Sequence, residues 1–336
     1  MVSLRVLFTT LCACRLFGMT HGSDGPSLWQ LPPDSTAIVT GGTKGIGRAI
    51  VEELAGSQFG VHVLTCARNE QDLAQCLDKW RASGMKVDGV VADVSTKEGR
   101  EKLMDAVKKW LDGKPLDVLV NNVGTNIRKP SIEYTAEDLE FIWRTNYESF
   151  FALTLACYPF LKRKQGEQTS SVVNIGSVAG VNCMKSGSIY ASTKAAMNQL
   201  TGNWACEWGL DGIRVNCVAP WYINTELAQQ VLKNPEYKKS VVGCTPMGRV
   251  GEPREVSIAT AKKCEMLKIQ STLLTFFGFL WSCRWQVWWH FCACQRQVTL
   301  RGKSFASTAV SLRTVSTTLS SANSNGSGVF LPRNMQ

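Results

Sequence analysis

Three residues, Ser177, Tyr190 and Lys194, have the types and spacing of a proton-transfer site. Tyr190 and Lys194 lie four positions apart, and residues four apart on a helix share one face, so the ammonium can lie beside the phenol. A neighbouring cation favours the phenolate, which predicts a pKa of Tyr190 below the usual value of about 10. The Ser177 hydroxyl, from a different segment, can bind the same substrate oxygen. A tuned proton donor beside an orienting hydroxyl suits reduction of a carbonyl group, provided that another group supplies hydride.

A glycine-rich turn near the N-terminus predicts where a hydride carrier would bind. Residues 36–40 form an apolar, β-branched run typical of a buried strand. The turn Gly41-Gly42-Thr43-Lys44-Gly45-Ile46-Gly47 follows, and then a segment of helical character. In a dinucleotide-binding unit the glycines admit the pyrophosphate and the helix N-terminus supplies N–H donors. The G-x-x-x-G-x-G spacing alone is equally compatible with an ordinary turn, but its place between strand and helix favours the nucleotide interpretation.

Arg68 and Lys44 indicate NADP(H) rather than NAD(H). An acidic residue at the end of the second strand of such a unit binds the ribose 2′-hydroxyl, whereas Arg accommodates a 2′-phosphate. Residues 61–69 contain no Asp or Glu, and Arg68 follows the strand expected at 61–66. Lys44, within the glycine turn, can reach the same corner. The alternative, two solvated surface cations, explains their strand-end position less well.

The remaining apolar runs alternate with helical segments. We expect strands at residues 86–92, 117–120, 172–175 and 213–218, and helices at 137–164, which carries Asn146, and at 187–208, which carries Tyr190 and Lys194. This alternation predicts a doubly wound parallel sheet covered on both faces, a Rossmann-like α/β fold in a single domain. Ligands of such sheets bind at the carboxyl ends of the strands.

Four residues near these strand ends have two interpretations each. Asp93 can hydrogen-bond an adenine edge, or it can cap the start of its own loop. Asn146 can serve the site, or it can be a mid-helix polar residue that bonds its neighbours. Trp221 and Tyr222 can line a substrate pocket or close the core.

Six motifs, in order, resemble the short-chain dehydrogenase/reductase family. They are T-G-G-T-K-G-I-G, D-V at 93–94, N-N-V-G at 121–124, Asn146 in T-N-Y-E-S, the set Ser177, Tyr190 and Lys194, and Pro220 after the sixth expected strand. The segments N-N-V-G-T-N-I-R-K-P, E-Y-T-A-E-D and V-A-P-W-Y-I-N-T further resemble the tropinone-reductase-like branch of plants. The resemblance covers residues 35–257.

The resemblance implies a homo-oligomeric, NADP(H)-dependent enzyme that reduces a small or cyclic ketone or oxidises the alcohol. It implies that Tyr190 is the acid/base, that Lys194 tunes it and holds the nicotinamide ribose, and that Ser177 positions the carbonyl. Asn146 would anchor a water that relays protons to Lys194, and Thr225 would bond the carboxamide or phosphate of the cofactor. The implied cofactor-binding residues are Gly41, Thr43, Lys44, Gly45, Ile46, Gly47, Arg68, Asp93, Val94, Asn121, Tyr190, Lys194, Pro220 and Thr225.

The family pattern ends at Ser257, and residues 258–336 do not continue it. The expected helix V-A-F-L-C-L-P-A and last strand Y-I-T-G-Q…V-D-G-G are missing from this reading frame. If the codons of residues 288–310 are read one nucleotide out of step, codon degeneracy permits both the expected helix and the expected last strand. We infer a retained intron or gene-model error between the codons of Ser257 and Gln286. The tail is then expected to be disordered or frameshifted. The sheet would lack its last strand, which makes the homo-oligomer doubtful. Transcript sequencing tests this, and an in-frame message with no shorter spliced form would contradict it.

Charge, histidine and cysteine patterns point away from other protein classes. The formal net charge is +10, but residues 258–336 hold nine Lys or Arg against one Glu, so we expect no nucleic-acid partner. The three His and the two C-x-C pairs lack metal-site spacing, and the thirteen Cys resemble reduced intracellular thiols. The apolar stretch 276–291 is broken by Arg284 and Gln286, and it is shorter than a membrane span.

One folded domain, residues 35–257, is expected between two extensions. Residues 1–34 are a targeting sequence or a disordered extension. A cytoplasmic location is expected, and a plastid or mitochondrion is the alternative if residues 1–34 are a transit peptide. Three functions remain open. They are an active ketone reductase, an inactive nucleotide-binding isoform caused by the altered ending, and a 3-oxoacyl-thioester reductase with the same motifs.

Overall fold

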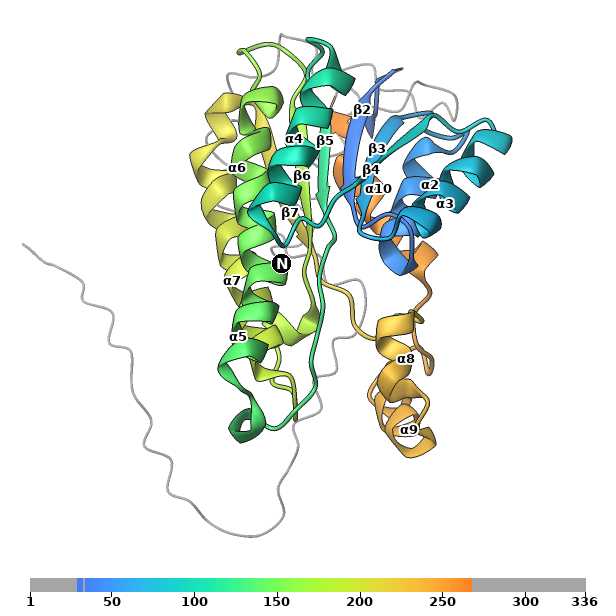
Figure 1. The fold of residues 1–336 in the computed structure, drawn as a ribbon, viewed down its shortest axis with the longest axis vertical. Helices are drawn as coiled ribbons and strands as arrows, with labels where there is room; N and C mark the ends of the chain where they lie inside the picture. The colour runs from blue at the N-terminus through green and yellow to red at the C-terminus, as the bar shows by residue number, and fades with distance from the viewer. Residues whose placement is uncertain (1–28, 33, 268–336) are drawn as a thin grey trace, which may run out of the picture. The chain divides into compact units, whose positions relative to one another are not determined.

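A parallel six-stranded sheet lies between two layers of helices in the computed structural model, which describes residues 29–32 and 34–267 (Figure 1). The strands are β2 (Thr36–Thr40), β3 (His62–Ala67), β4 (Val87–Val91), β5 (Val118–Asn121), β6 (Ser170–Ile175) and β7 (Ile213–Val218). Their order is β4-β3-β2-β5-β6-β7, and each neighbouring pair is parallel. The doubly wound α/β fold predicted from the sequence is therefore confirmed.

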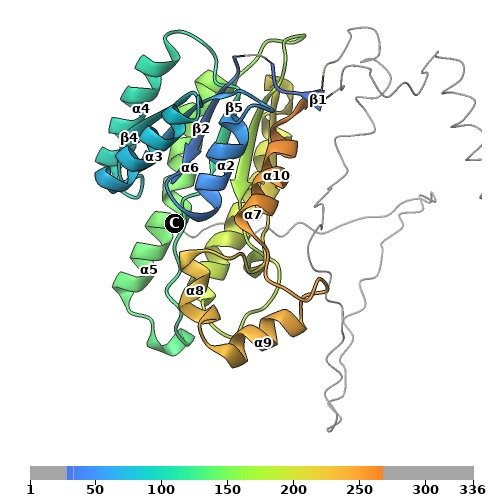
Figure 2. The same ribbon diagram turned by 90° about the vertical axis from the view of Figure 1, so that its right-hand side faces the viewer.

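Helices cover both faces of the sheet (Figures 1 and 2). On one face lie α2 (Gly45–Ala55), α3 (Glu70–Ala82) and α10 (Pro253–Cys264), and on the other α4 (Lys97–Leu111), α6 (Ser149–Leu161) and α7 (Ser188–Glu207). Side chains alternate along a strand, so Ala37 and Val39 pack in the first layer and Ile38 in the second. Since both faces are covered, the strands carry apolar residues on both sides, and β6 also buries the polar residues Ser170, Ser171 and Asn174.

The order of the strands places a crevice at their carboxyl ends. The chain moves outward from β2 to β3 and β4, and then returns to β5 on the other side of β2. The loops after β2 and β5 therefore diverge, which is the usual ligand position in doubly wound sheets. Two further helices, α8 (Glu226–Leu232) and α9 (Pro235–Gly243), project beyond this end of the sheet, opposite α5 (Ala136–Trp143) (Figure 1).

The long helix predicted over residues 137–164 is present, but it ends at Leu161 and one of its turns is widened. The segment consists of α5, a π-helical turn (Arg144–Glu148) and α6, and the π turn contains Asn146. Hydrophobic periodicity cannot reveal one widened turn, but such turns often occur at functional sites. Short 3₁₀ helices lie at Ser131–Glu133, Val178–Gly180 and Gly209–Asp211.

The expectation of disorder from residue 258 onward was wrong for residues 258–267. Helix α10 continues to Cys264 because Ala261 and Cys264 are buried against α2. The Arg214 guanidinium, from β7, donates to the carbonyls of Lys263 and Glu265 and so satisfies the end of the helix. Beyond it, β8 (Met266–Leu267) pairs antiparallel with β1 (Trp29–Gln30).

The rest of the predicted tail and of the N-terminal extension, residues 268–336, 1–28 and 33, lies outside the described residues. Among the described strands β7 pairs only with β6, so its other edge has no partner there. None of the helices in the described part of the chain is both long and apolar enough to cross a membrane. The described cysteines are all free thiols.

Candidate functional site

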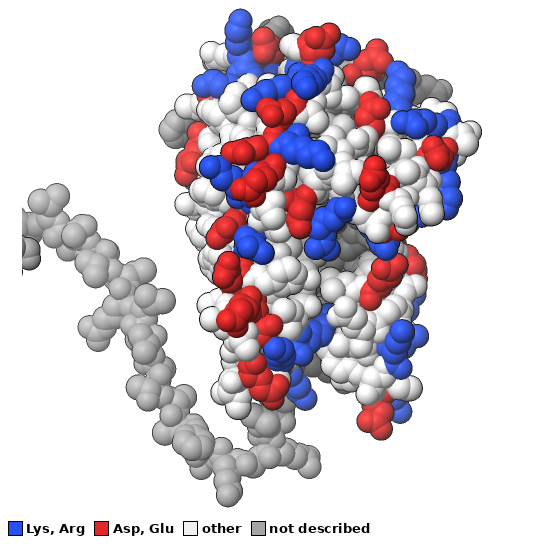
Figure 3. Space-filling model, in the orientation of Figure 1, with Lys and Arg blue, Asp and Glu red and all other residues white. Residues whose placement is uncertain are grey.

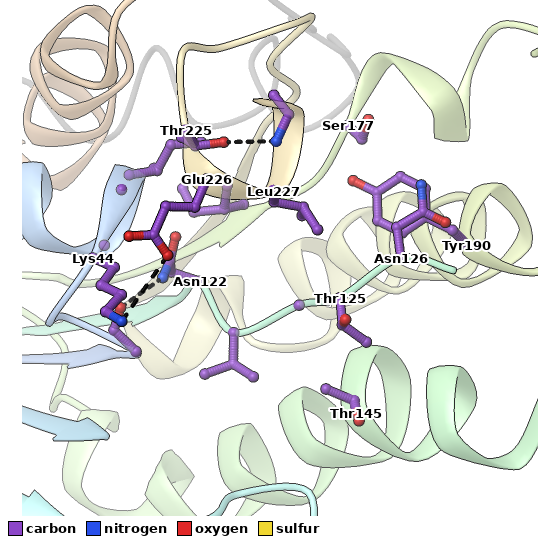
Figure 4. Close-up of a pocket in the computed structure, with 18 of the residues that line it drawn as sticks. Lys44, Asn122, Thr125, Asn126, Thr145, Ser177, Tyr190, Thr225, Glu226 and Leu227 are labelled. Carbon is purple, nitrogen blue, oxygen red and sulfur yellow. Dashed lines mark hydrogen bonds and ion pairs between the residues drawn. The ribbon is translucent and has the colours of Figure 1, made fainter. Parts of the chain in front are cut away.

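A cavity of about 550 Å³ lies at the carboxyl ends of the strands, between the glycine turn and α8 on one side and α7 on the other (Figure 4). The predicted site residues that line it are Gly41, Thr43, Lys44, Gly45, Ile46, Gly47, Arg68, Asp93, Val94, Ser177, Tyr190, Lys194, Pro220 and Thr225. The fold thus brings together residues from five loops and two helices. On the surface, a hollow separates α5 from α8 and α9 (Figure 3).

The glycine turn leaves room and hydrogen-bond donors for a phosphate group. A Cβ at Gly47 would lie 2.2 Å from the Gly41 carbonyl oxygen, so only glycine lets the turn fold this tightly. Gly45 has a φ of +55°, in the left-handed region that glycine adopts most easily. Helix α2 begins there, and its N-cap, Lys44, makes no side-chain capping hydrogen bond. The first N–H groups of an eleven-residue helix are therefore available to an anion, which fits a dinucleotide pyrophosphate.

The two predicted cations of the adenosine corner differ in their surroundings. The Lys44 ammonium lies 4.0 Å from Glu226 (Figure 4). It also lies 3.0 Å from Asp72, and the hydrogen bond to Asp72 raises the pKa of Lys44. No sequence pattern indicated either of these ion-pair partners. Arg68 is exposed at the edge of the cavity and forms no ion pair with the described residues. Arg68 is therefore the better candidate for a 2′-phosphate.

Ser177 and Tyr190 present their hydroxyls to the same part of the cavity (Figure 4). Ser177 follows β6 as the N-cap of a 3₁₀ turn, where its oxygen accepts a hydrogen bond from the Ala179 N–H at 3.1 Å. Its own hydroxyl hydrogen remains available for a ligand. Burial raises the pKa of Tyr190, while the Ser177 hydroxyl and then the Arg128 charge act in the opposite direction. The phenol is therefore protonated at neutral pH and can donate.

The prediction that Lys194 depresses the pKa of Tyr190 was wrong for this structure. The Lys194 ammonium lies 5.9 Å from the Tyr190 ring centroid and donates to the Ile175 carbonyl at 2.7 Å. It thus faces the end of β6 rather than the phenol. Helical spacing placed both residues on one face but could not show where the long lysine side chain ends. Burial also lowers the pKa of Lys194 to about 8.

Asn146 is fully buried behind the cavity wall. Its Oδ1 accepts from the Thr125 N–H at 2.7 Å, and its Nδ2 donates to the Thr125 carbonyl at 2.9 Å. A Cβ at Gly124 would lie 3.6 Å from Asn146 Oδ1 and 3.4 Å from Lys194 Nζ, so the bare glycine leaves space between these two polar groups. The π turn therefore fixes the loop after β5 against Lys194.

Asn121 does not line the cavity, in contrast to its predicted cofactor contact. Its buried Nδ2 donates to Thr154 and Asn174 across the sheet. The next residue, Asn122, lines the cavity. Its Nδ2 donates hydrogen bonds to the carbonyls of Thr40 and Gly41 and so holds the glycine turn in place. A strand alternates its faces, so a prediction one residue out of register selects the wrong asparagine.

Asp93, Trp221 and Tyr222 line the cavity and also make structural contacts. Asp93 lines the cavity and also accepts from the Ser95 N–H, as a loop cap does. Trp221 and Tyr222 line the cavity and pack in a small core cluster under α8 and α9.

The cavity residues that were not predicted include three with polar side chains, Asn126, Arg128 and Thr145. The signal for Arg128 was present, since N-I-R-K-P places a cation just after a strand-end N-N-V-G. The described residues contain no cluster of His, Cys, Asp or Glu that could hold a metal ion.

The lowered pKa of Lys194 makes stability depend on pH. The unfolded chain, with a lysine pKa near 10.5, binds more protons than the folded protein above about pH 8. The free energy of unfolding contributed by Lys194 therefore rises between about pH 8 and 10, by up to about 1.4 kcal/mol per pH unit. Urea unfolding of the cofactor-free protein at about pH 7.5 and 9.5 should show this rise in the wild type relative to Lys194→Met. Buried cysteines titrate in both proteins, so an identical pH dependence would contradict the prediction.

Comparison with known proteins places the chain among related sequences and folds. The family model for short chain dehydrogenase matches residues 35–236. A tropinone reductase homolog of Arabidopsis thaliana is 51% identical over 236 residues, which cover 70% of this chain and 87% of the relative. A second Arabidopsis thaliana homolog, named as chloroplastic, is 54% identical over 236 residues, which cover 70% of this chain and 71% of the relative. A solved Pseudomonas aeruginosa RhlG/NADP active-site complex has 30% identity and a TM-score of 0.65, covering 72% of this chain and 92% of that one.

Proposed function

The chain belongs to the short chain dehydrogenase family, and we propose that it is a ketone reductase that uses NADPH. One observation carries the proposal: a protonated phenol, Tyr190, and a free hydroxyl, Ser177, open on the same cavity as a glycine turn suited to a dinucleotide. Bound NADPH would supply hydride. The chain itself supplies the proton and holds the carbonyl in place.

Each catalytic side chain has a defined task in this proposal. Ser177 donates a hydrogen bond to the ketone oxygen and orients the carbonyl group. Tyr190 donates its phenolic proton to that oxygen as negative charge develops on it, and its raised pKa keeps the proton in place until then. Lys194 lies one helical turn from Tyr190 and replaces the proton that the phenol has donated. Asn146 fixes the loop that lies between Asn146 and Lys194.

NADP(H) is the proposed cofactor because of Arg68 and of the absence of an acid at residues 61–69. The RhlG structure is named as an NADP complex, which supports the same class of cofactor. Replacing Arg68 by Ala is expected to raise the KM for NADPH by about 10-fold or more, and to leave the KM for NADH nearly unchanged. Initial rates with both cofactors measure this. Arg81→Ala, at an exposed cation on α3, is the control. An equal effect on both cofactors would contradict the proposal.

Turnover by the full chain tests the proposed function. Oxidation of NADPH should accelerate when a panel of small and cyclic ketones is added, with formation of the corresponding alcohols. Binding of NADPH without turnover of any ketone would favour the inactive nucleotide-binding isoform instead. A 3-oxoacyl-thioester reductase would prefer thioesters over cyclic ketones in the same assay.

The cellular location and the oligomeric state of the enzyme are also proposed. A cytoplasmic location is proposed for the enzyme, and the relative named as chloroplastic keeps a plastid as the alternative. A homo-oligomer is proposed from the family. Imaging of a fluorescent fusion tests the location, and a mitochondrial signal would contradict the proposed location. Light scattering tests the assembly, and a monomer would contradict the proposed homo-oligomer.

A further inference from the structure

The cavity has polar groups that the proposed proton transfer leaves unused. Asn126 Oδ1, Arg128 Nε and Thr145 Oγ1 are buried and lack a hydrogen-bond partner among the described residues. All three residues line the cavity, where Asn126 is 8% and Thr145 6% exposed. Figure 4 draws Asn126 and Thr145 around the same space as Tyr190. Buried polar groups in native proteins nearly always have partners, so this wall is built for a polar ligand.

Arg128 brings a positive charge to this wall without a counterion. It forms no ion pair with the described residues, whereas the adjacent Lys129 is paired with Asp138. The acidic residues that line the cavity, Asp93 and Glu226, are engaged elsewhere: Asp93 with the Ser95 N–H and Glu226 near Lys44. A half-buried cation that lacks a partner is unfavourable. An anion that entered the cavity would relieve this cost.

The guanidinium is held in a fixed position near the proposed proton donor. Its Cζ lies 5.8 Å from the centroid of the Tyr222 ring, a cation–π arrangement. The Tyr222 hydroxyl is in turn hydrogen-bonded to Tyr237 of α9 at 2.5 Å, which fixes the ring. Burial raises the pKa of both Tyr190 and Tyr222, and the Arg128 charge acts in the opposite direction at each, so it lies within electrostatic reach of both phenols. A ligand bound at Tyr190 and Ser177 can therefore reach Arg128.

We propose that Arg128 makes this enzyme selective for ketones that carry a carboxylate or comparable oxyanion, with Asn126 and Thr145 binding other polar groups of the same substrate. The proposal rests on the proposed reductase function. A guanidinium can grip a carboxylate through two parallel hydrogen bonds, which a lysine cannot reproduce. A phosphate of the cofactor is the other anion to be distinguished, although Arg68 and the N-terminus of α2 already provide for it.

Binding of an unreactive acid tests the inference independently of turnover. The probes are cyclohexanecarboxylate and its methyl ester, titrated calorimetrically into the full chain saturated with NADP⁺. The wild type should bind the acid about 10- to 100-fold more tightly than the ester. Arg128→Met should abolish that preference, Arg128→Lys should retain part of it, and Lys129→Met, at a neighbouring cation outside the cavity, should retain all of it. Equal affinities for acid and ester in the wild type, or an unchanged preference in Arg128→Met, would overturn the inference.

Two further measurements keep the test decisive. If Arg128→Met does not fold, raising the ionic strength from about 0.05 to 0.5 M should weaken binding of the acid to the wild type and spare the ester, since salt screens charge pairs. A binding preference that does not respond to salt would overturn the inference. A loss of NADPH affinity in Arg128→Met without any change for the acid would assign Arg128 to the cofactor and would also overturn it.

Turnover separates this inference from the function on which it rests. With 4-oxocyclohexanecarboxylate and its methyl ester as substrates, we expect kcat/KM to favour the acid about 10-fold or more in the wild type but not in Arg128→Met. If both ketones are reduced equally well, the reductase function stands and the selectivity is refuted. If neither is reduced while the acid still binds through Arg128, the anion site stands and the reductase function is refuted.

Discussion

Replacing Tyr190 by Phe is expected to lower kcat/KM for ketone reduction by about 10²- to 10⁴-fold. The variant keeps the ring and its packing but removes the only hydroxyl of α7 that opens on the cavity next to Ser177. The ketone oxygen would then lack its proton donor, while NADPH, held by the glycine turn and Arg68, should bind within about threefold of its wild-type affinity. Initial rates of NADPH oxidation and a fluorescence titration of the cofactor give the two quantities.

Tyr158→Phe is the matched control for that experiment. The Tyr158 hydroxyl is hydrogen-bonded to Asp211, and the residue lies on α6 away from the cavity. Its loss should leave the turnover number unchanged, apart from any change in stability. Should Tyr190→Phe and Tyr158→Phe reduce ketones equally fast, Tyr190 would not be the proton donor.

Replacing Gly47 by Ala is expected to cost about 2–3 kcal/mol of stability and to weaken NADPH binding by about 10-fold or more. The added Cβ would meet the Gly41 carbonyl oxygen at 2.2 Å and Asn122 Nδ2 at 2.4 Å. The first of these atoms belongs to the backbone of the turn, so relief of the clash must displace the turn itself. That displacement moves the N–H groups proposed to bind the pyrophosphate.

Gly243→Ala provides the comparison for that variant. Gly243 lies at the end of α9 with nothing within 4 Å of an added Cβ, and its φ is not positive. Urea unfolding and NADPH titration of both variants measure the two effects. A Gly47→Ala protein as stable as Gly243→Ala, with normal cofactor affinity, would show that the turn is not constrained as the structure implies.

The strands and the family could be predicted from the sequence because their signals are local. The strand expected at 36–40 matches β2, and that at 213–218 matches β7, because both segments are short and rich in β-branched residues, which favour strands. The motifs that resemble the short-chain dehydrogenase family occur in order, and the family model and relatives confirm that resemblance.

The predictions that were wrong concern contacts between residues far apart in the sequence, which local sequence patterns do not indicate. The spacing of Tyr190 and Lys194 is correct for one helix face, but the lysine side chain ends at the Ile175 carbonyl of another strand. Arg128, sixty-two residues upstream of Tyr190, is the cation whose charge acts on the phenol. The π turn at Asn146 breaks a periodicity that reads as continuous helix. Residues 258–267 are ordered by contacts with α2 and with Arg214, which tail composition alone could not reveal.

Isotope transfer tests the central claim most directly. The full chain is supplied with NADPH that carries deuterium at both C4 positions and with a cyclic ketone, and the product is examined by mass spectrometry and NMR. The proposed function predicts an alcohol with one deuterium on the carbinol carbon, formed rapidly by the wild type and very slowly by Tyr190→Phe. NADPH that stays unoxidised although bound, or an alcohol without deuterium at that carbon, would contradict the proposal.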